Sequence, residues 1–405
     1  MTNSGKTKTY FFRGTLFLIA AILILGAFNY NKLIRLKRVV SLFNADVIDE
    51  NFRSMDMLFD STVVNKSDNP HKFTYDLKDL PQSYTYEGEE KKISDFLERT
   101  HTTGFIVLKD NTVKFEDYYR GNNELSRTIS WSVAKSIVSA LFGIAVADGD
   151  IKSVEESVTD YVPELKGSGY DGVRIKDVLQ MSSGIQFNED YGDFNSDINR
   201  MGREFALNRS LLKFISSLKP EREPGTYNHY VSMDTQVLGM IIIAATGKSI
   251  TEYTETKLWK PLGMESNAAW LVDSEKAETA FGGFNSILRD YAKFGRLYLK
   301  KGRWENKQII PEQWIHDSIT PDAPHLMPGE NPYSGWVLGY GYQWWIPENS
   351  DGEFMAIGIY GQAIYIYPRY NIIIVKSSAY PDYNKDGQAM ELESIEVFRA
   401  IAKKI

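Results

Sequence analysis

Cysteine is absent from this chain of 405 residues. Its absence excludes disulfide bonds, thiolate metal sites, a cysteine nucleophile and a lipid-modified N-terminal cysteine. Histidine is scarce as well, with five in the chain and no His-Glu-x-x-His pattern, so a zinc hydrolase has little support. We therefore expect chemistry that needs neither a metal nor a cofactor.

Low-complexity tracts and internal repeats are also lacking. Hydrophobic residues make up 43% of the chain and charged residues 24%, with 30 glycines and 14 prolines, which is the usual mix of a globular protein. The length predicts about two to four domain-sized units. A large buried core is therefore expected.

Positive charge is scarce outside the N-terminus. Seven of the 46 lysines and arginines precede the first acidic residue, Asp46, which leaves 39 basic residues against 53 acidic ones in the rest of the chain. An acidic globular part of this kind is not expected to bind a nucleic acid. The basic N-terminal end needs a separate explanation.

An uncharged apolar run from Gly14 to Phe28 lies between these basic residues. Its length falls between that of a signal-peptide core and the about 20 residues of a spanning helix. Flanking aromatic and polar residues extend it, so we expect membrane contact through residues 10–30. Leu25 and Ala27 make a poor cleavage site, which favours an uncleaved anchor over a removed signal; a buried core helix is the third alternative.

The sequence after the anchor predicts a mixed α and β domain. Residues 103–119 form two β-rich runs about an Asp-Asn turn, which indicates a hairpin. Short strands recur towards the C-terminus, and a mostly helical region separates them from the hairpin. Such an order predicts an α+β fold in which an antiparallel sheet is flanked by helices and an α-rich lobe is inserted.

The predicted divisions follow from this pattern. The expected units are an anchor or signal over 1–38, a linker over 39–90, and a catalytic domain over 91–405, divided into a subdomain of 91–150 plus 281–405 and a helical lobe of 151–280. A site is expected in the cleft between the sheet and the lobe.

The pattern Ser-x-x-Lys occurs three times, at Ser132 to Lys135, Ser210 to Lys213 and Ser216 to Lys219. The second and third copies lie in a stretch whose lysines alternate with apolar residues, as on a solvated amphipathic helix. The first copy opens an apolar run, residues 132–147, which predicts a helix buried on every face.

Ser132 and Lys135 would lie one helical turn apart, on the same face of this buried helix. Burial lowers the pKa of a lysine, so a neutral amine could accept the proton of the serine hydroxyl and activate it for acyl transfer. A lysine that extends from the first turn to solvent is the equal alternative.

Two further segments carry candidate residues. The first is Pro-Gly-Thr-Tyr-Asn-His-Tyr-Val-Ser at 224–232, in which Tyr230 could shuttle a proton and Ser232 could bind substrate; a packed loop tyrosine is the alternative. The second is Gly358 to Gln362, where glycines interrupt a strand pattern and permit a close approach to the backbone; a bulge at a sheet edge is the alternative.

Taken in order, these segments resemble the serine β-lactamase and penicillin-binding protein superfamily, in the branch of class C β-lactamases, esterases and 6-aminohexanoate-dimer hydrolases. The resemblance extends from about residue 103 to the C-terminus and includes the accessory stretches DVLQMSSGI, LGMIIIAATGKSI, FGGFNSILRDYAKFGRLYLKKGRW and GYGYQWWI. It implies a hydrolase that forms and then hydrolyses an acyl-enzyme, and it implies export to a bacterial-type cell envelope or periplasm.

The resemblance implies roles for particular residues. Ser132 would be the nucleophile, Lys135 its base and Tyr230 the residue that moves protons to the leaving group and from the deacylating water. The backbone N–H groups of Ser132 and Gln362, the residue after Gly361, would form the oxyanion hole.

Two departures from the family pattern affect the expected substrate. Ser232 stands where the family often has asparagine, and Ile359-Tyr360-Gly361 replaces Lys-Thr-Gly, so no cation is supplied for a substrate carboxylate. A linear small-molecule amide or ester therefore fits better than a β-lactam, with Tyr191, Tyr360 and Trp345 as expected walls of the pocket. The alternatives are a true β-lactamase, an envelope sensor that deacylates poorly, and a purely structural envelope protein.

Overall fold

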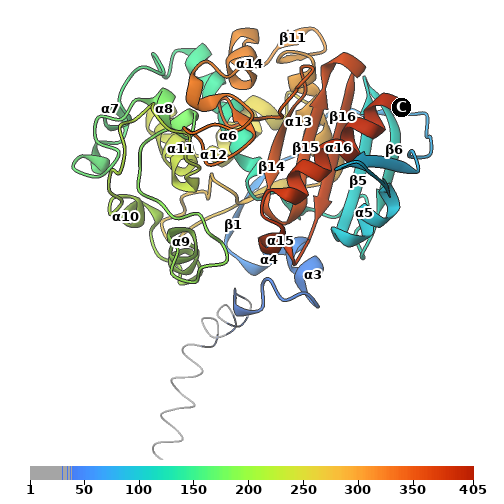
Figure 1. The fold of residues 1–405 in the computed structure, drawn as a ribbon. Helices are drawn as coiled ribbons and strands as arrows, with labels where there is room; N and C mark the ends of the chain where they lie inside the picture. The colour runs from blue at the N-terminus through green and yellow to red at the C-terminus, as the bar shows by residue number, and fades with distance from the viewer. Residues whose placement is uncertain (1–29, 31–33, 35–36, 38) are drawn as a thin grey trace, which may run out of the picture.

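An eight-stranded sheet forms one side of the molecule in the computed structural model, which describes Tyr30, Ile34, Lys37 and residues 39–405 (Figure 1). All neighbouring strands are antiparallel except β2 and β6, which are parallel. In spatial order the strands are β12 (Gly339–Tyr340), β13 (Trp345–Ile346), β14 (Phe354–Gly358), β15 (Gln362–Tyr367), β16 (Ile372–Ser378), β5 (Thr102–Lys109), β6 (Thr112–Tyr118) and β2 (Thr74–Tyr75). The predicted hairpin is thus β5 and β6, and the C-terminal strands complete its sheet.

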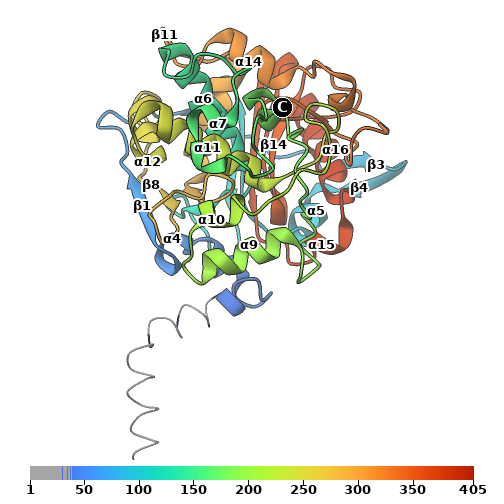
Figure 2. The same ribbon diagram turned by 90° about the vertical axis from the view of Figure 1, so that its left-hand side faces the viewer.

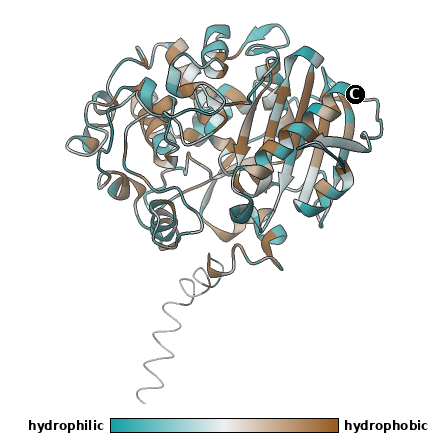
Figure 3. Cartoon of the chain, viewed as in Figure 1, coloured by the Kyte–Doolittle hydropathy of each residue, from teal (hydrophilic) through white to brown (hydrophobic). Residues whose placement is uncertain are grey.

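Helices cover both faces of this sheet, as predicted. In β16, Ile373 and Val375 point into the cluster that contains α13 (Leu288–Leu299), whereas Ile372 and Ile374 point into the cluster that contains α16 (Ala389–Lys404). Side chains alternate between the faces of a strand, so an apolar run is expected only where both faces are covered. Figure 3 shows hydrophobic residues along the central strands.

The inserted lobe is mostly helical, which confirms the predicted α+β fold class. It lies beside the sheet in Figure 1 and carries a π-helical turn at Glu255–Trp259 after its last helix. Its α-helices are α7 (Val158–Tyr161), α8 (Ile175–Leu179), α9 (Asp197–Ala206), α10 (Leu211–Ile215), α11 (Ser232–Thr246) and α12 (Ile250–Thr254).

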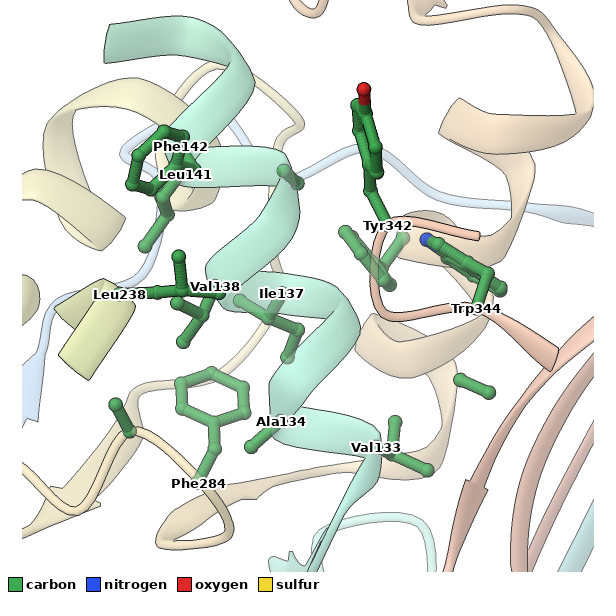
Figure 4. Packing of buried hydrophobic residues seen from close by; sticks show 14 of the residues in the cluster. Val133, Ala134, Ile137, Val138, Leu141, Phe142, Leu238, Phe284, Tyr342 and Trp344 are labelled. Atoms are coloured by element: carbon green, nitrogen blue, oxygen red, sulfur yellow. The ribbon is translucent and has the colours of Figure 1, made fainter. Parts of the chain in front are cut away.

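Helix α6 (Val133–Asp148) passes between the sheet and the lobe and is buried on every face, as its apolar run predicts. Figure 4 shows Val138 against Leu238 of α11, and Ala134 beside Phe284. The helix ends at Gly149, whose φ of 82° is the left-handed conformation that glycine adopts at helix C-termini. The helix is therefore packed both against α11 of the lobe and against Phe284.

Residues 39–90, predicted as a linker, instead contain two helices and four strands. These are α3 (Ile48–Phe52), α4 (Met55–Leu58), β1 (Ser61–Val64), β2, β3 (Ser83–Tyr86) and β4 (Glu89–Lys92). Strand β1 pairs with β8 (Ala268–Leu271) in a second sheet of order β1-β8-β9-β7 (Figure 2). A four-residue strand has too few positions to show a period, and its partner is about 200 residues away in the chain.

The remaining elements are short. They are α5 (Ile93–Arg99), β7 (Thr128–Ile129), β9 (Phe284–Ser286), β10 (Arg303–Trp304), β11 (Lys307–Gln308), α14 (Glu312–Ile319), α15 (Tyr383–Asp386) and the 3₁₀ turns Pro163–Leu165, Pro324–Leu326, Ile359–Gly361 and Pro368–Tyr370. Across the described residues, no helix has the length and apolarity to span a bilayer. The predicted membrane segment, Gly14 to Phe28, lies outside the described residues.

Candidate active site

The N-terminus of α6 presents Ser132. This serine is the N-cap residue, yet its side chain makes no capping hydrogen bond, so the hydroxyl is free to meet other groups. The preceding Ser130 donates its backbone N–H to Phe284 O at 2.8 Å, which ties the turn before the helix to strand β9. A hydroxyl at this position also faces the positive end of the helix dipole.

Lys135 lies one turn later and its side chain is 2% exposed. Its Nζ is 3.0 Å from Ser132 Oγ, 3.2 Å from Ser232 Oγ and 2.6 Å from the carbonyl oxygen of Phe281. Burial lowers the pKa of Lys135 to about 7, against the weaker opposing effects of the carboxylates of Glu189 and Asp234. The amine therefore exists to a large extent in its neutral form near neutral pH.

Tyr230 closes the other side of the pair. Its ring centroid lies 5.1 Å from Lys135 Nζ, and its ring stacks on Trp345 at 5.4 Å. Burial raises the pKa of Tyr230, Glu189 raises it further, and a hydrogen bond with the Ser132 side chain acts in the opposite direction. The phenol therefore keeps its proton at neutral pH.

Glu189 is a site residue that the sequence analysis missed. It accepts hydrogen bonds from the hydroxyl of Ser232 at 2.5 Å, from the backbone N–H of Ser232 at 3.0 Å and from the hydroxyl of Tyr191 at 2.7 Å. A chain of contacts thus leads from Lys135 through Ser232 to Glu189. No sequence motif marks this glutamate, because it reaches the pair from a loop outside regular secondary structure.

The third predicted segment lies at the turn between β14 and β15. Tyr360 has a φ of 62° and Gly361 a φ of 87°, and a Cβ on Gly361 would lie 2.9 Å from the amine of Lys376. Only glycine fits there without displacement of the lysine. Lys376, on β16, is 2% exposed and donates to the carbonyl oxygen of Gly361 at 3.1 Å. The sequence analysis did not identify this lysine either.

A cavity of about 490 Å³ joins these groups. Among the predicted residues, Ser132, Tyr191, Tyr230 and Trp345 line it. Lys135 and Ser232 each contact a residue that lines the cavity: Lys135 hydrogen-bonds with Ser132, and Ser232 hydrogen-bonds with Glu189.

Gln362, Gly361 and Tyr360 do not line the cavity. The side-chain oxygen of Gln362 instead accepts the backbone N–H of Ser378 at 3.1 Å. The residues that reach the cavity from this part of the sheet are Ile357 and Ile359.

The wall of the cavity is aromatic and acidic. Its aromatic members include Trp336 and Tyr383, and its charged side chains are Glu189 and Asp190, with neither lysine nor arginine among the described residues that line it.

A larger hollow of about 940 Å³ lies beside α5 and contains none of the predicted residues. Over the part of the chain that the structure describes, no group of three His, Asp or Glu side chains is arranged to hold a metal ion.

The comparisons with known proteins agree with this geometry. The sequence profile named Beta-lactamase matches residues 90–396. The chain is 32% identical to the 6-aminohexanoate-dimer hydrolase of Paenarthrobacter ureafaciens over 294 residues, which cover 71% of this chain and 74% of that protein.

Two solved structures share the fold. The structure named "Putative 6-aminohexanoate-dimer hydrolase from Bacillus anthracis" has a TM-score of 0.80 at 24% identity and covers 90% of this chain and 95% of its own. The structure named "EstCE1, a hydrolase with promiscuous acyltransferase activity" has a TM-score of 0.61 at 13% identity and covers 76% of this chain and 96% of its own.

Proposed function

Because the chain belongs to the Beta-lactamase family, whose profile matches three quarters of it, we propose that it is a serine hydrolase that cleaves an amide or ester bond through an acyl-enzyme on Ser132. The observation that carries the proposal is the contact between Ser132 Oγ and the buried amine of Lys135, at 3.0 Å. A hydroxyl next to a neutral, desolvated amine is the arrangement that activates a serine nucleophile.

The opposite pKa shifts support the two proposed proton-transfer roles. The pKa of Lys135 is lowered to about 7, so its amine can accept the proton of Ser132, whereas the raised pKa of Tyr230 keeps a proton on the phenol. A neutral amine that donates its two N–H groups to Phe281 O and Ser232 Oγ keeps its lone pair for the hydroxyl hydrogen of Ser132. Lys135 is therefore the base, and Tyr230 donates.

The reaction then proceeds in two balanced steps. Ser132 Oγ attacks the carbonyl carbon while its proton passes to Lys135, and the leaving nitrogen or oxygen departs with a proton delivered through Tyr230. In the second step water attacks the acyl carbonyl carbon and its proton passes through the same groups to Ser132 Oγ, while the bond between Oγ and the acyl carbon breaks and the carboxylic acid leaves. The phenol is suited to this relay because Tyr230 lines the cavity together with Ser132 and its ring lies against Lys135 Nζ.

The oxyanion of the tetrahedral intermediate needs two N–H donors. We assign the first to Ser132, at the N-terminus of α6. For the second, we propose the backbone N–H of Ile359 in place of that of Gln362, because Ile359 lines the cavity with Ser132 and Gln362 does not.

The substrate class follows from the cavity wall. Two carboxylates and several aromatic rings line it without a lysine or arginine among the described residues, so a substrate carboxylate would find no partner there. We infer a linear amide or ester without an anionic group near the scissile bond, in keeping with the 6-aminohexanoate-dimer hydrolase relative. Efficient turnover of a β-lactam, which carries such a carboxylate, is not expected.

Covalent capture tests the proposal. We expect a fluorophosphonate probe to add one label per chain, with the label on Ser132 by peptide mass spectrometry, and Ser132→Ala to take none. Ser210→Ala is the matched control, since it removes the serine of another Ser-x-x-Lys and should leave labelling unchanged. Labelling of Ser132→Ala at the wild-type rate, or no label on the wild type, would refute the proposal.

We further propose that residues 10–30 anchor this hydrolase in a bacterial-type cell membrane, with the domain from residue 91 outside the cytoplasm. The support is the uncharged run from Gly14 to Phe28 between basic residues. After cell fractionation the full chain should stay in the membrane pellet through a carbonate wash, and a chain that starts at residue 39 should not. Recovery of both in the soluble fraction would contradict the anchor.

A further inference from the structure

The N-terminal segment, residues 39–59, packs on the two backbone turns that hold the candidate site. It lies outside the part of the chain that the family profile matches. Its side chains nevertheless share a buried cluster with Ile129 of β7, Leu271 of β8 and Tyr360 of the third predicted segment. In Figure 1 its helix α3 lies near α15, below the lower ends of the strands of the large sheet.

Two aromatic side chains of this segment make the closest contacts. The ring of Phe43 stacks on Tyr360 at 5.2 Å with an interplanar angle of 13°, and the ring of Phe52 meets Tyr360 edge-on at 5.1 Å. Both rings also contact Trp131, at 6.0 Å and 5.3 Å respectively. Trp131 and Tyr360 contact each other at 5.9 Å, so the four rings form one cluster.

Trp131 and Tyr360 are each next in the chain to a residue that lines the cavity. Trp131 directly precedes Ser132, and Tyr360 directly follows Ile359, which lines the same cavity. Both have left-handed backbone conformations, with φ of 45° and 62°. Bulky side chains adopt that conformation only where the surrounding structure imposes it, because it costs conformational free energy.

Polar contacts fix the segment to the same region. Arg120 Nε donates to Asp49 Oδ2 at 2.8 Å, Arg53 Nη1 donates to the carbonyl oxygen of Arg120 at 3.2 Å, and Arg127 pairs with Asp56. The rings of Phe43 and Phe52 are therefore held in register with the turns.

We propose that Phe43 and Phe52 are positioning residues of the active site, which hold the turns at Trp131 and Tyr360 and thereby align Ser132 with the backbone at Ile359. The inference rests on the proposed function of Ser132. Neither phenylalanine touches the substrate cavity. Their loss should therefore slow acylation and leave substrate binding largely intact.

The test compares single variants of the full chain. Phe52→Ala and Phe43→Ala are expected to lower kcat on a nitrophenyl ester, and the rate of fluorophosphonate labelling, by about 10- to 100-fold, with KM changed less than about threefold. Phe43→Tyr, which keeps the stacking ring, should retain kcat within about twofold. Phe43 is 44% exposed, so its truncation leaves a folded chain even if Phe52→Ala fails to fold.

Phe59→Ala is the matched control. Phe59 belongs to the same segment and is 7% exposed, but its ring packs on Phe205 of α9, at 5.5 Å. It should reduce thermal stability and leave the kcat of folded protein unchanged. Wild-type labelling rates in Phe43→Ala, or an equal loss of kcat in Phe59→Ala, would overturn the inference alone, whereas a wild-type chain without label on Ser132 would overturn it together with the proposed function.

Discussion

The same four-residue pattern has different surroundings in two regions of the molecule. Ser132 and Lys135 lie at the start of α6, where Lys135 is 2% exposed. Ser210 and Lys213 lie at the start of α10, also with the serine at the N-cap, but Lys213 is exposed to solvent. The helical spacing is shared, so the spacing alone creates no reactive pair.

The difference lies in what surrounds each amine. Nζ of Lys135 contacts two hydroxyl groups and a carbonyl, whereas Lys213 lies on the surface beside Arg209. Lys293, 0% exposed in α13, gives a second contrast, because it pairs with Asp290 and Glu265, each at 3.0 Å. Burial without a paired carboxylate destabilises the ammonium form, and burial with one compensates it.

The largest expected effect distinguishes the lysines of the two Ser-x-x-Lys copies, because loss of Lys135 and loss of Lys213 should change kcat very differently. Lys135→Ala is expected to lower kcat at least about 1,000-fold, because the base and its contacts are lost together, and Lys213→Ala should stay within about twofold. Lys135→Arg should be as inactive as the alanine variant, since a guanidinium does not give up its proton. Steady-state ester hydrolysis measures all three, and an active Lys135→Arg would show that a neutral amine is not needed.

The phenol is the next test, because the ring of Tyr230 lies 5.1 Å from Nζ of Lys135 in the first Ser-x-x-Lys copy. Tyr230→Phe removes the proton donor and keeps the ring that stacks on Trp345, so kcat should fall about 100- to 1,000-fold with the fold intact. Tyr227→Phe, in the same loop, should have no effect. Single-turnover acylation measures the loss of the proton donor, and thermal unfolding checks that the fold is intact. A fully active Tyr230→Phe would show that another group donates the proton.

The smallest expected effect is a shift in the pH dependence of acylation. With the pKa of Lys135 near 7, acylation should rise with pH through about 7 and fall about tenfold for each unit below it, as the amine becomes protonated. Glu189 raises that pKa, so Glu189→Gln should move the acid limb to lower pH, by less than about one unit.

Glu204→Gln is the matched control, because Glu204 pairs with Arg209 on the lobe, whereas the carboxylates that act on the pKa of Lys135 are Glu189 and Asp234. It should leave the pH profile unchanged. An acid limb that moves to higher pH in Glu189→Gln would contradict the assignment of Lys135 as the titrating base.

Much of the fold could be predicted from local sequence. The hairpin of β5 and β6 and the helix α6 agree with their predicted ranges to within a few residues, because each has a clear period and an end signal. Strand β1 and the rest of its sheet were not predicted, because strands of four residues or fewer are defined by distant partners. For the same reason the N-terminal segment resembled a linker, although it buries Ile48, Phe52 and Met55.

The candidate site divides in the same way. Motif order was enough to select Ser132, Lys135 and Tyr230, which the structure brings together. It gave no sign of Glu189 or Lys376, since a lone charged residue carries no pattern. The resemblance to the family named Gln362, whereas Ile359 is the residue of this turn that lines the cavity with Ser132, because the order of motifs does not show which way a turn faces.

Sequence by itself determined that Ser132 and Lys135 stand one turn apart on an apolar helix, since helical spacing is a local property of the backbone. Only the tertiary structure decided that the amine of Lys135, which lies between the hydroxyl groups of Ser132 and Ser232, is shielded from water. The groups that exclude water from it, in α11 and at Phe281, lie about 100 to 150 residues further along the chain. Desolvation is a property of everything around an atom, and no short stretch of sequence contains it.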